Sequence, residues 1–160
     1  MSETLNYESL LRLLTENEVK MIVIGAVAMN LHATDNVTYD LDICFERSSE
    51  NIERLCRTLA PHCPVIRSAF IDMMDFLKTN PKGEKFSTDF GDIDLLGEVP
   101  GLGDYQATLQ FASMVQLEDF SVQALTLDGL IKAKEAANRP KDQLHLITLR
   151  ALKKMEDEEK

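Results

Sequence analysis

A strictly alternating segment, residues 39–46 (YDLDICFE), constrains the fold more than any other part of the sequence. Polar and apolar residues take turns along it, which is typical of a β-strand with one buried face. Side chains two positions apart on a strand point to the same side, so Asp40 and Asp42 emerge together, opposite the apolar residues that alternate with them. The sequence therefore predicts a sheet that presents two neighbouring carboxylates on its less buried face.

Two carboxylates side by side repel each other, and each raises the pKa of the other. A divalent cation relieves this cost. Mg²⁺ suits the position best, because it prefers hard oxygen ligands and binds through one or two carboxylates together with substrate phosphates. Taken alone the Asp-x-Asp pair is weak evidence, since most such pairs lie at solvated strand ends.

The residues before this strand add a second feature. Residues 20–24 (KMIVI) form a short apolar run that predicts a buried strand, and residues 26–33 (AVAMNLHA) are rich in helix formers. Gly25 stands between them, where a glycine lets the backbone approach a ligand closely. The free N–H groups at the start of the following helix favour an anion such as phosphate. A simple tight turn at Gly25 is the alternative.

A second acidic strand is expected at residues 91–97 (GDIDLLG), where Asp92 and Asp94 share one face. If this strand lies beside residues 39–46, three or four carboxylates converge. Such a cluster could hold two metal ions a few ångströms apart, the arrangement used for in-line displacement at phosphorus.

The whole pattern predicts one α+β domain over residues 1–160, a two-layer α/β structure with a mixed sheet of about five strands flanked by helices. We expect Ser48 and Thr126 to cap helices, Pro61 and Pro64 to bracket a loop, and Pro140 to open the last helix. The remaining expectations are helices at 6–17, 48–59, 67–78 and 104–113, hairpins at 86–97 and 113–125, a loop at 101–103, and a helical C-terminal segment at 127–156.

Composition excludes several classes of protein. No apolar run approaches the length of a membrane span, and the acidic start has no signal-peptide core, so the cytoplasm is the expected location. The three cysteines are irregularly spaced, which argues against a disulfide framework or a structural zinc site. The net charge of −10 disfavours non-specific nucleic-acid binding. Basic residues nevertheless outnumber acidic ones over residues 132–154, a segment that is either a solvated helix face or a phosphate contact.

Three segments in this order resemble the DNA polymerase β-like nucleotidyltransferase superfamily. They are IVIGAVAMNLHATDNVTYDLDI, GDIDLLGEVPG and LTLDGLIKAKEAANRPKD, and together they extend over most of the chain. The third segment is similar to the C-terminal helices of small bacterial members, including the minimal nucleotidyltransferases and the nucleotidyltransferase toxins of abortive-infection systems. The resemblance implies the nucleotidyltransferase fold.

The resemblance also implies a mechanism and a set of roles. Asp40, Asp42 and Asp94 would be the catalytic residues and the ligands of two Mg²⁺ ions, and an acceptor hydroxyl would attack the α-phosphate of a nucleoside triphosphate, releasing pyrophosphate. The implied nucleotide-binding residues are Gly25, Ala26, Thr38 and Lys134, with Lys132 as a second candidate lysine. The acceptor, which could be RNA, protein or a small molecule, is left open, as is a homodimer or partner protein that completes its site.

Two departures from the superfamily pattern keep another class of function open. Ala26 stands where many relatives have serine, and Asn36 stands where many have an arginine two residues before Thr38. Without that arginine the site lacks a planar, permanently charged phosphate ligand. The alternative is therefore a non-catalytic nucleotide- or partner-binding protein, for example a toxin–antitoxin component, that keeps the fold.

Overall fold

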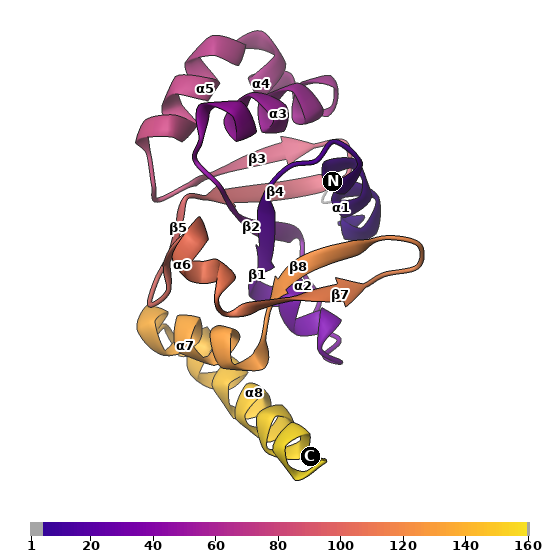
Figure 1. The fold of residues 1–160 in the computed structure, drawn as a ribbon, viewed down its shortest axis with the longest axis vertical. Helices are drawn as coiled ribbons and strands as arrows, with labels where there is room; N and C mark the ends of the chain where they lie inside the picture. The colour runs from indigo at the N-terminus through magenta and orange to yellow at the C-terminus, as the bar shows by residue number, and fades with distance from the viewer. Residues whose placement is uncertain (1–4, 160) are drawn as a thin grey trace.

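A mixed six-stranded sheet forms the centre of the molecule in the computed structural model, which describes residues 5–159 (Figure 1). The strands run in the order β3-β4-β2-β1-β8-β7. Their bounds are β1 Met21–Ile24, β2 Asp40–Phe45, β3 Glu84–Thr88, β4 Gly91–Leu96, β7 Ala112–Gln116 and β8 Ser121–Leu125. A separate two-stranded ribbon pairs β5 Glu98–Val99 with β6 Gly103–Asp104.

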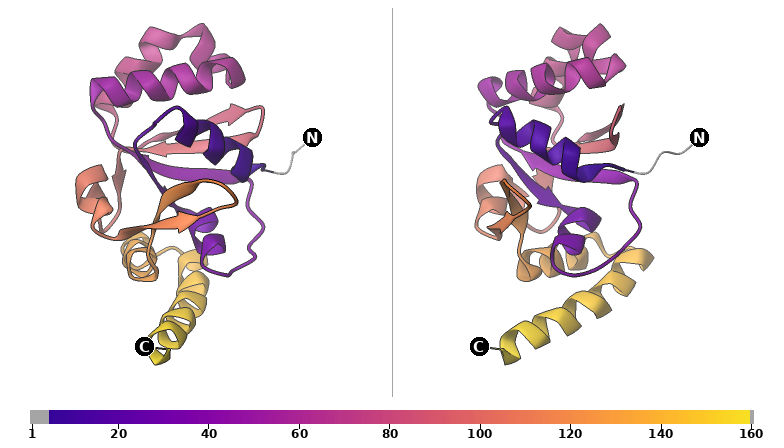
Figure 2. Two further views of the ribbon diagram at one scale, coloured as in Figure 1. Left: turned by 45° about the vertical axis from the view of Figure 1, so that its right-hand side comes forward. Right: turned by 90° about the vertical axis from the view of Figure 1, so that its right-hand side faces the viewer.

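Helices cover two opposite ends of this sheet (Figure 2). The group next to β3 and β4 consists of α3 Ser49–Leu59, the 3₁₀ turn η1 Ala60–His62, α4 Pro64–Ser68 and α5 Phe70–Thr79. At the opposite end lie α7 Leu127–Ala137 and α8 Pro140–Glu158. The remaining helices are α1 Tyr7–Glu16, α2 Gly25–Leu31 and α6 Tyr105–Leu109.

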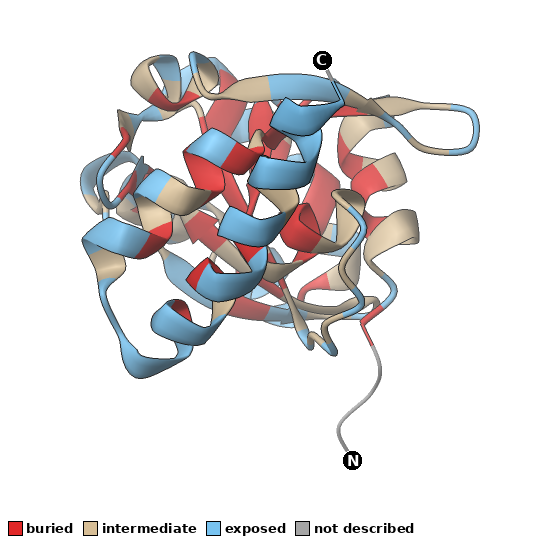
Figure 3. Ribbon diagram, turned by 90° about the horizontal axis from the view of Figure 1, so that it is seen from below, coloured by how far each residue is buried: buried red, intermediate tan, exposed pale blue. Residues whose placement is uncertain are grey.

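Strand β2 lies near the middle of the sheet, between β4, to which it is parallel, and β1, to which it is antiparallel. Leu41 and Ile43 of β2 are fully buried, as the alternating pattern predicts. Figure 3 shows the molecule from the end covered by α8, whose outer surface is exposed while buried residues lie behind it. Strand β2 is thus held between two neighbouring strands. Its apolar side chains face the core, and its acidic side chains lie on the opposite face of the sheet.

Local sequence signals account for most element boundaries. The side chains of Ser48 and Thr126 accept hydrogen bonds from the N–H groups of Asn51 and Gly129, at 3.2 and 3.1 Å, and so cap α3 and α7 as predicted. Pro140 occupies the first turn of α8, where its missing N–H is not needed.

Some expectations were wrong. Pro61 and Pro64 do not bracket a loop: they lie in the first turns of η1 and α4, because the fixed φ of proline suits the start of a helix. The expected loop at 101–103 lies largely between β5 and β6 and ends in β6, and the helix expected at 104–113 is confined to α6. The main sheet, by contrast, agrees with the expected mixed sheet of about five strands, since it has six.

Candidate functional site

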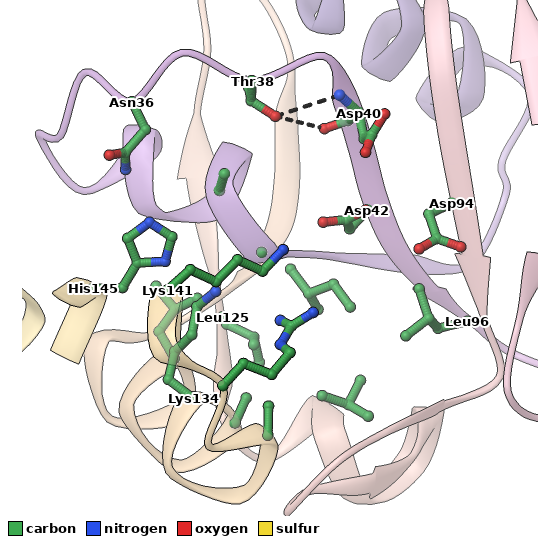
Figure 4. Close-up of a pocket in the computed structure, with 18 of the residues that line it drawn as sticks. Asn36, Thr38, Asp40, Asp42, Asp94, Leu96, Leu125, Lys134, Lys141 and His145 are labelled. Atoms are coloured by element: carbon green, nitrogen blue, oxygen red, sulfur yellow. Dashed lines mark hydrogen bonds between the residues drawn. The ribbon is translucent and has the colours of Figure 1, made fainter. Parts of the chain in front are cut away.

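The parallel pairing of β2 and β4 brings acidic residues of both strands to one face of the sheet. Asp42 is the register partner of Asp94, and Asp40 is the partner of Asp92. Both strands show their buried positions on the other face, at Leu41 and Ile93 among others. The expected meeting of Asp42 and Asp94 is therefore confirmed, and Figure 4 shows their carboxylates on adjacent strands facing the same space.

These carboxylates lie at one wall of a pocket of about 770 Å³. All seven residues that the sequence analysis assigned to catalysis, metal or nucleotide line it, so the fold brings together elements that are up to 109 positions apart in the chain. They are Gly25, Ala26, Thr38, Asp40, Asp42, Asp94 and Lys134.

Gly25 sits against the Asp42 carboxylate at the point where β1 ends and α2 begins. Its φ is +66°, in the left-handed region, and a Cβ added there would collide with Oδ2 of Asp42. The preceding residue, Ile24, provides no side-chain cap for α2. Only a glycine at this position permits both the turn and the close approach of the backbone to the acidic pair.

Asp42 and Asp94 are partly buried carboxylates with no counter-ion in contact. Neither accepts a hydrogen bond or forms an ion pair with another residue of the range 5–159. Burial, followed by repulsion from Asp94 and Asp40, raises the pKa of Asp42 to about 6. Burial also raises the pKa of Asp94, although the Lys85 ammonium opposes this. The pair is thus held in a state that a cation would stabilise.

Asp40 differs from the other two because its carboxylate has a partner. Lys85 of β3 donates from Nζ to Oδ2 of Asp40 at 2.8 Å. Thr38 holds the start of β2 in place: its Oγ1 donates to the carbonyl of Asp40 at 3.0 Å and accepts from the N–H of the same residue at 3.4 Å (Figure 4). In this conformation both hydrogen bonds of the Thr38 hydroxyl are made to the backbone of Asp40.

Asp92, the fourth carboxylate considered from the sequence, takes no part in the pocket. It accepts a hydrogen bond from Ser87 Oγ at 3.0 Å and is absent from the pocket lining. Ser87 and Lys85 are two positions apart on β3, so this edge strand supplies a partner to each of the two outer carboxylates.

The opposite wall of the pocket is basic and comes from the junction of α7 and α8. Lys134 is 9% exposed and pairs through Nζ with Oδ1 of the fully buried Asp142 at 3.2 Å. Arg139 donates from Nε to the other oxygen of Asp142 at 2.7 Å. Two cations share one carboxylate, so this wall keeps a net positive charge facing the acidic pair. Lys134 therefore does not lie on a solvated helix face, which was one of the two alternatives for residues 132–154.

Sequence reasoning missed several residues of the pocket, namely Lys85, Arg139, Lys141 and His145. The Nδ1 atom of His145 is buried without a hydrogen-bond partner among residues 5–159, and burial lowers the pKa of this imidazole. Its spacing of four from Lys141 puts both residues on one helix face, which is the only signal that could have indicated it. Lys132 is exposed beside the ring of Phe111 and does not line the pocket.

The donor set fits a divalent ion in part. Within residues 5–159 no three carboxylate, imidazole or thiolate side chains are arranged to hold a metal ion as they stand. Two of the three predicted ligands, Asp42 and Asp94, have no hydrogen-bond or ion-pair partner among the described residues, while the third, Asp40, is paired with Lys85. Mg²⁺ needs only one or two carboxylates when water and phosphate oxygens supply the other ligands. The residues therefore fit an ion that binds together with a phosphate-bearing ligand.

The two residues that depart from the superfamily pattern also face the pocket. Ala26 offers only its backbone N–H as a donor. Asn36 is bound into the loop before β2, where its backbone N–H donates to Asn30 Oδ1 at 2.9 Å and its side chain donates to Thr34 Oγ1 at 3.1 Å.

Comparison with known proteins identifies the fold. No family model matches the sequence, and no curated protein matches it either. Among solved structures, the chain is similar to a protein from Thermotoga maritima described as a "putative nucleotidyltransferase", with a TM-score of 0.59 and 13% sequence identity. The similarity covers 89% of this chain and 91% of that one. At this identity the likeness shows the architecture alone, and the chain has a nucleotidyltransferase fold.

None of the helices in the described part of the chain combines the length and apolar character that a membrane span requires.

Proposed function

We propose that this protein transfers a nucleotidyl group from a nucleoside triphosphate to an acceptor hydroxyl, with the help of divalent metal. One observation carries the proposal: Asp42 and Asp94 lie side by side in a pocket whose far wall is basic, and no residue of the range 5–159 forms an ion pair with either of them. Without a bound cation this arrangement lowers the free energy of unfolding, because the like charges repel and are partly desolvated. It becomes favourable once a cation and a polyphosphate bind together.

Asp40, Asp42 and Asp94 would hold Mg²⁺, two ions if all three take part. The N–H groups of Gly25 and Ala26 and the ammonium of Lys134 would contact the β- and γ-phosphates. Backbone N–H groups at a helix start and a fixed cation both suit phosphate oxygens. Thr38 would keep its place at the start of β2 and set the position of Asp40.

In the proposed step the acceptor oxygen forms a bond to the α-phosphorus while the bond from that phosphorus to the bridging oxygen breaks and pyrophosphate leaves. Bound metal would polarise the phosphate and neutralise the charge that develops. Asp94 would accept the proton of the acceptor hydroxyl, a role that its raised pKa favours. The rest of the rate enhancement would come from positioning.

A second function, nucleotide or partner binding without catalysis, is favoured by specific features of the same pocket. Ala26 has no hydroxyl, Asn36 is engaged in its own loop, and Lys134 is already paired with Asp142. A toxin–antitoxin component that keeps the fold would belong to this class. Under this alternative the protein would bind a triphosphate and transfer nothing.

The metal assignment is tested by thermal unfolding with and without Mg²⁺ and a nucleoside triphosphate. At ligand concentrations of about 100 times Kd, mass action should stabilise the protein by about 2.7 kcal/mol and raise Tm by roughly 5–10 °C. Asp42→Asn should lose this joint effect. Asp92→Asn is the matched control, because Asp92 lies on the neighbouring strand yet outside the pocket, and it should respond like the parent.

Equal stabilisation of Asp42→Asn and the parent would show that the metal site is wrongly assigned. Transfer itself is tested by incubation with α-labelled triphosphates and a cell extract, followed by separation of RNA, protein and small molecules. Label in any one fraction identifies the class of acceptor. Clear binding with no transfer to any fraction would favour the second function.

A further inference from the structure

Lys85 forms an ion pair with Asp40, the carboxylate that is expected to be the third metal ligand. Its Nζ lies 2.8 Å from Oδ2 of Asp40, and its position on β3 is in register with Asp94 on β4. Phe86, the next residue, is buried on the other face, so Lys85 projects from the edge strand on the acidic side of the sheet. Its side chain is half-exposed, so there is room for the ammonium to swing away from Asp40.

This contact engages one of the three carboxylates on the acidic face, and no three-ligand metal site is formed within residues 5–159. In the described part of the chain Asp42 and Asp94 have no ion-pair partner, while Asp40 is paired with Lys85. An ammonium group can neutralise one carboxylate, but it cannot bridge several as a divalent ion does.

We propose that Lys85 is a built-in counter-ion that stabilises the acidic face in the metal-free protein and is displaced from Asp40 when metal binds. The exchange frees Asp40 to complete the three-carboxylate site. This inference rests on the proposed metal site. Lys85 would lower the affinity of that site for metal, so metal would bind well only together with a phosphate-bearing ligand that contributes further contacts.

The exchange has a thermodynamic consequence that can be measured. Lys85 and the metal ion compete for one carboxylate, so each must weaken the binding of the other by the same factor. Removing the ammonium should destabilise the metal-free protein, because Asp40 then loses its ion-pair partner. The same change should tighten metal binding.

The test uses Lys85→Met, which keeps most of the aliphatic side chain and removes the charge. Mn²⁺ binding is measured by calorimetry at pH 8 and low ionic strength, where the carboxylates are ionised and screening is weak. Lys85→Met should bind Mn²⁺ about fivefold more tightly than the parent, the lower end of typical couplings between sites. Its metal-free Tm should be lower, and saturating Mn²⁺ should close that gap.

Two control variants separate the contact from a general charge effect. Lys85→Arg keeps a cation within reach of Asp40 and should retain the weaker, parental affinity. Lys82→Met removes an exposed positive charge three residues earlier, at a position outside the main pocket, and should leave Mn²⁺ affinity unchanged.

The outcomes distinguish this inference from the proposed function. Parental or weaker Mn²⁺ binding by Lys85→Met, while the parent itself binds Mn²⁺, overturns the counter-ion role and leaves the metal site intact. Equal tightening by Lys82→Met also overturns it, since the effect would then be long-range. If neither parent nor variant binds Mn²⁺, the proposed function fails together with this inference.

Discussion

Two aspartates on opposite walls of the pocket are treated in opposite ways by the fold. Asp142 at the start of α8 is fully buried and accepts hydrogen bonds from Lys134, from the Arg139 side chain and from the Arg139 backbone N–H. These bonds hold the pKa of Asp142 well below its usual range. Asp42 has no such partner, and its pKa rises to about 6.

The difference shows which charge belongs to the structure and which is kept for a ligand. A buried carboxylate with several donors is satisfied internally, and its neighbours are fixed in place by it. A partly buried carboxylate beside another carboxylate costs stability until something positive arrives. Asp142 thus positions the two cations of the basic wall, while Asp42 keeps its binding capacity.

The largest effect is expected from Asp142→Asn, which should lower the free energy of unfolding by about 3 kcal/mol at neutral pH. The substitution removes the negative charge shared by Lys134 and Arg139 and weakens the first turn of α8. Urea denaturation measures the loss. Asp75→Asn, at an exposed position of α5, is the control and should change stability by less than about 0.5 kcal/mol.

Asp42→Asn should have the opposite sign in metal-free buffer. The pKa of Asp42 is raised from 3.8 to about 6 in the folded protein, so the folded state holds the proton more tightly than the unfolded chain. Parental stability must then fall as pH rises from about 4 to about 6, and the cost is fully present above that window. The neutral variant avoids it and should be more stable at pH 7–8 by about 2 kcal/mol.

The check is a series of urea denaturations from pH 4 to pH 8 in the presence of a chelator. The gain from Asp42→Asn should be near zero at the acid end and grow through the window. A variant less stable than the parent at pH 8 would mean that Asp42, like Asp142, is satisfied within the fold, and the contrast between the two walls would be lost.

The smallest change in stability is expected from Gly25→Ala, which tests whether the backbone sets the position of Asp42. The left-handed conformation should cost about 1 kcal/mol, and the added methyl group must push the Asp42 carboxylate away from its place. Mn²⁺ affinity should fall with it. Gly103→Ala, also at positive φ but at a residue that does not line the pocket, should lose stability and keep its response to Mn²⁺.

The acidic wall could be predicted from sequence because its signals are local. Strict alternation over residues 39–46 identifies the strand and its exposed face, and the same pattern recurs at 91–97. Once two strands are paired in parallel, the period of two decides which aspartates share a side. Gly25 was found the same way, from an apolar run that ends where helix formers begin.

The position of the basic wall opposite the acidic pair could not be predicted, because it depends on the tertiary fold, although the pairings within that wall join residues at most eight positions apart. Nothing in the sequence links Lys85 to Asp40, which is 45 positions away. Nothing in it indicates either that His145 lines the same pocket as Asn36, in the loop before β2. Lys134 was named from resemblance, but its burial against Asp142 was not foreseen. The proline error has a different origin, because the signal was local: Pro64 and Pro140 both open a helix, and only Pro140 was predicted to do so.

The central position of β2 has a consequence for the local stability of the site. The backbone amides of residues 41–44 are flanked on both sides by other strands, so they can open to solvent only when the sheet itself comes apart. Hydrogen exchange at these amides should therefore be among the slowest in the chain. The distance between the Asp42 and Asp94 backbones would then stay fixed until the whole domain unfolds. Ligand entry would depend on the side chains and loops around the pocket.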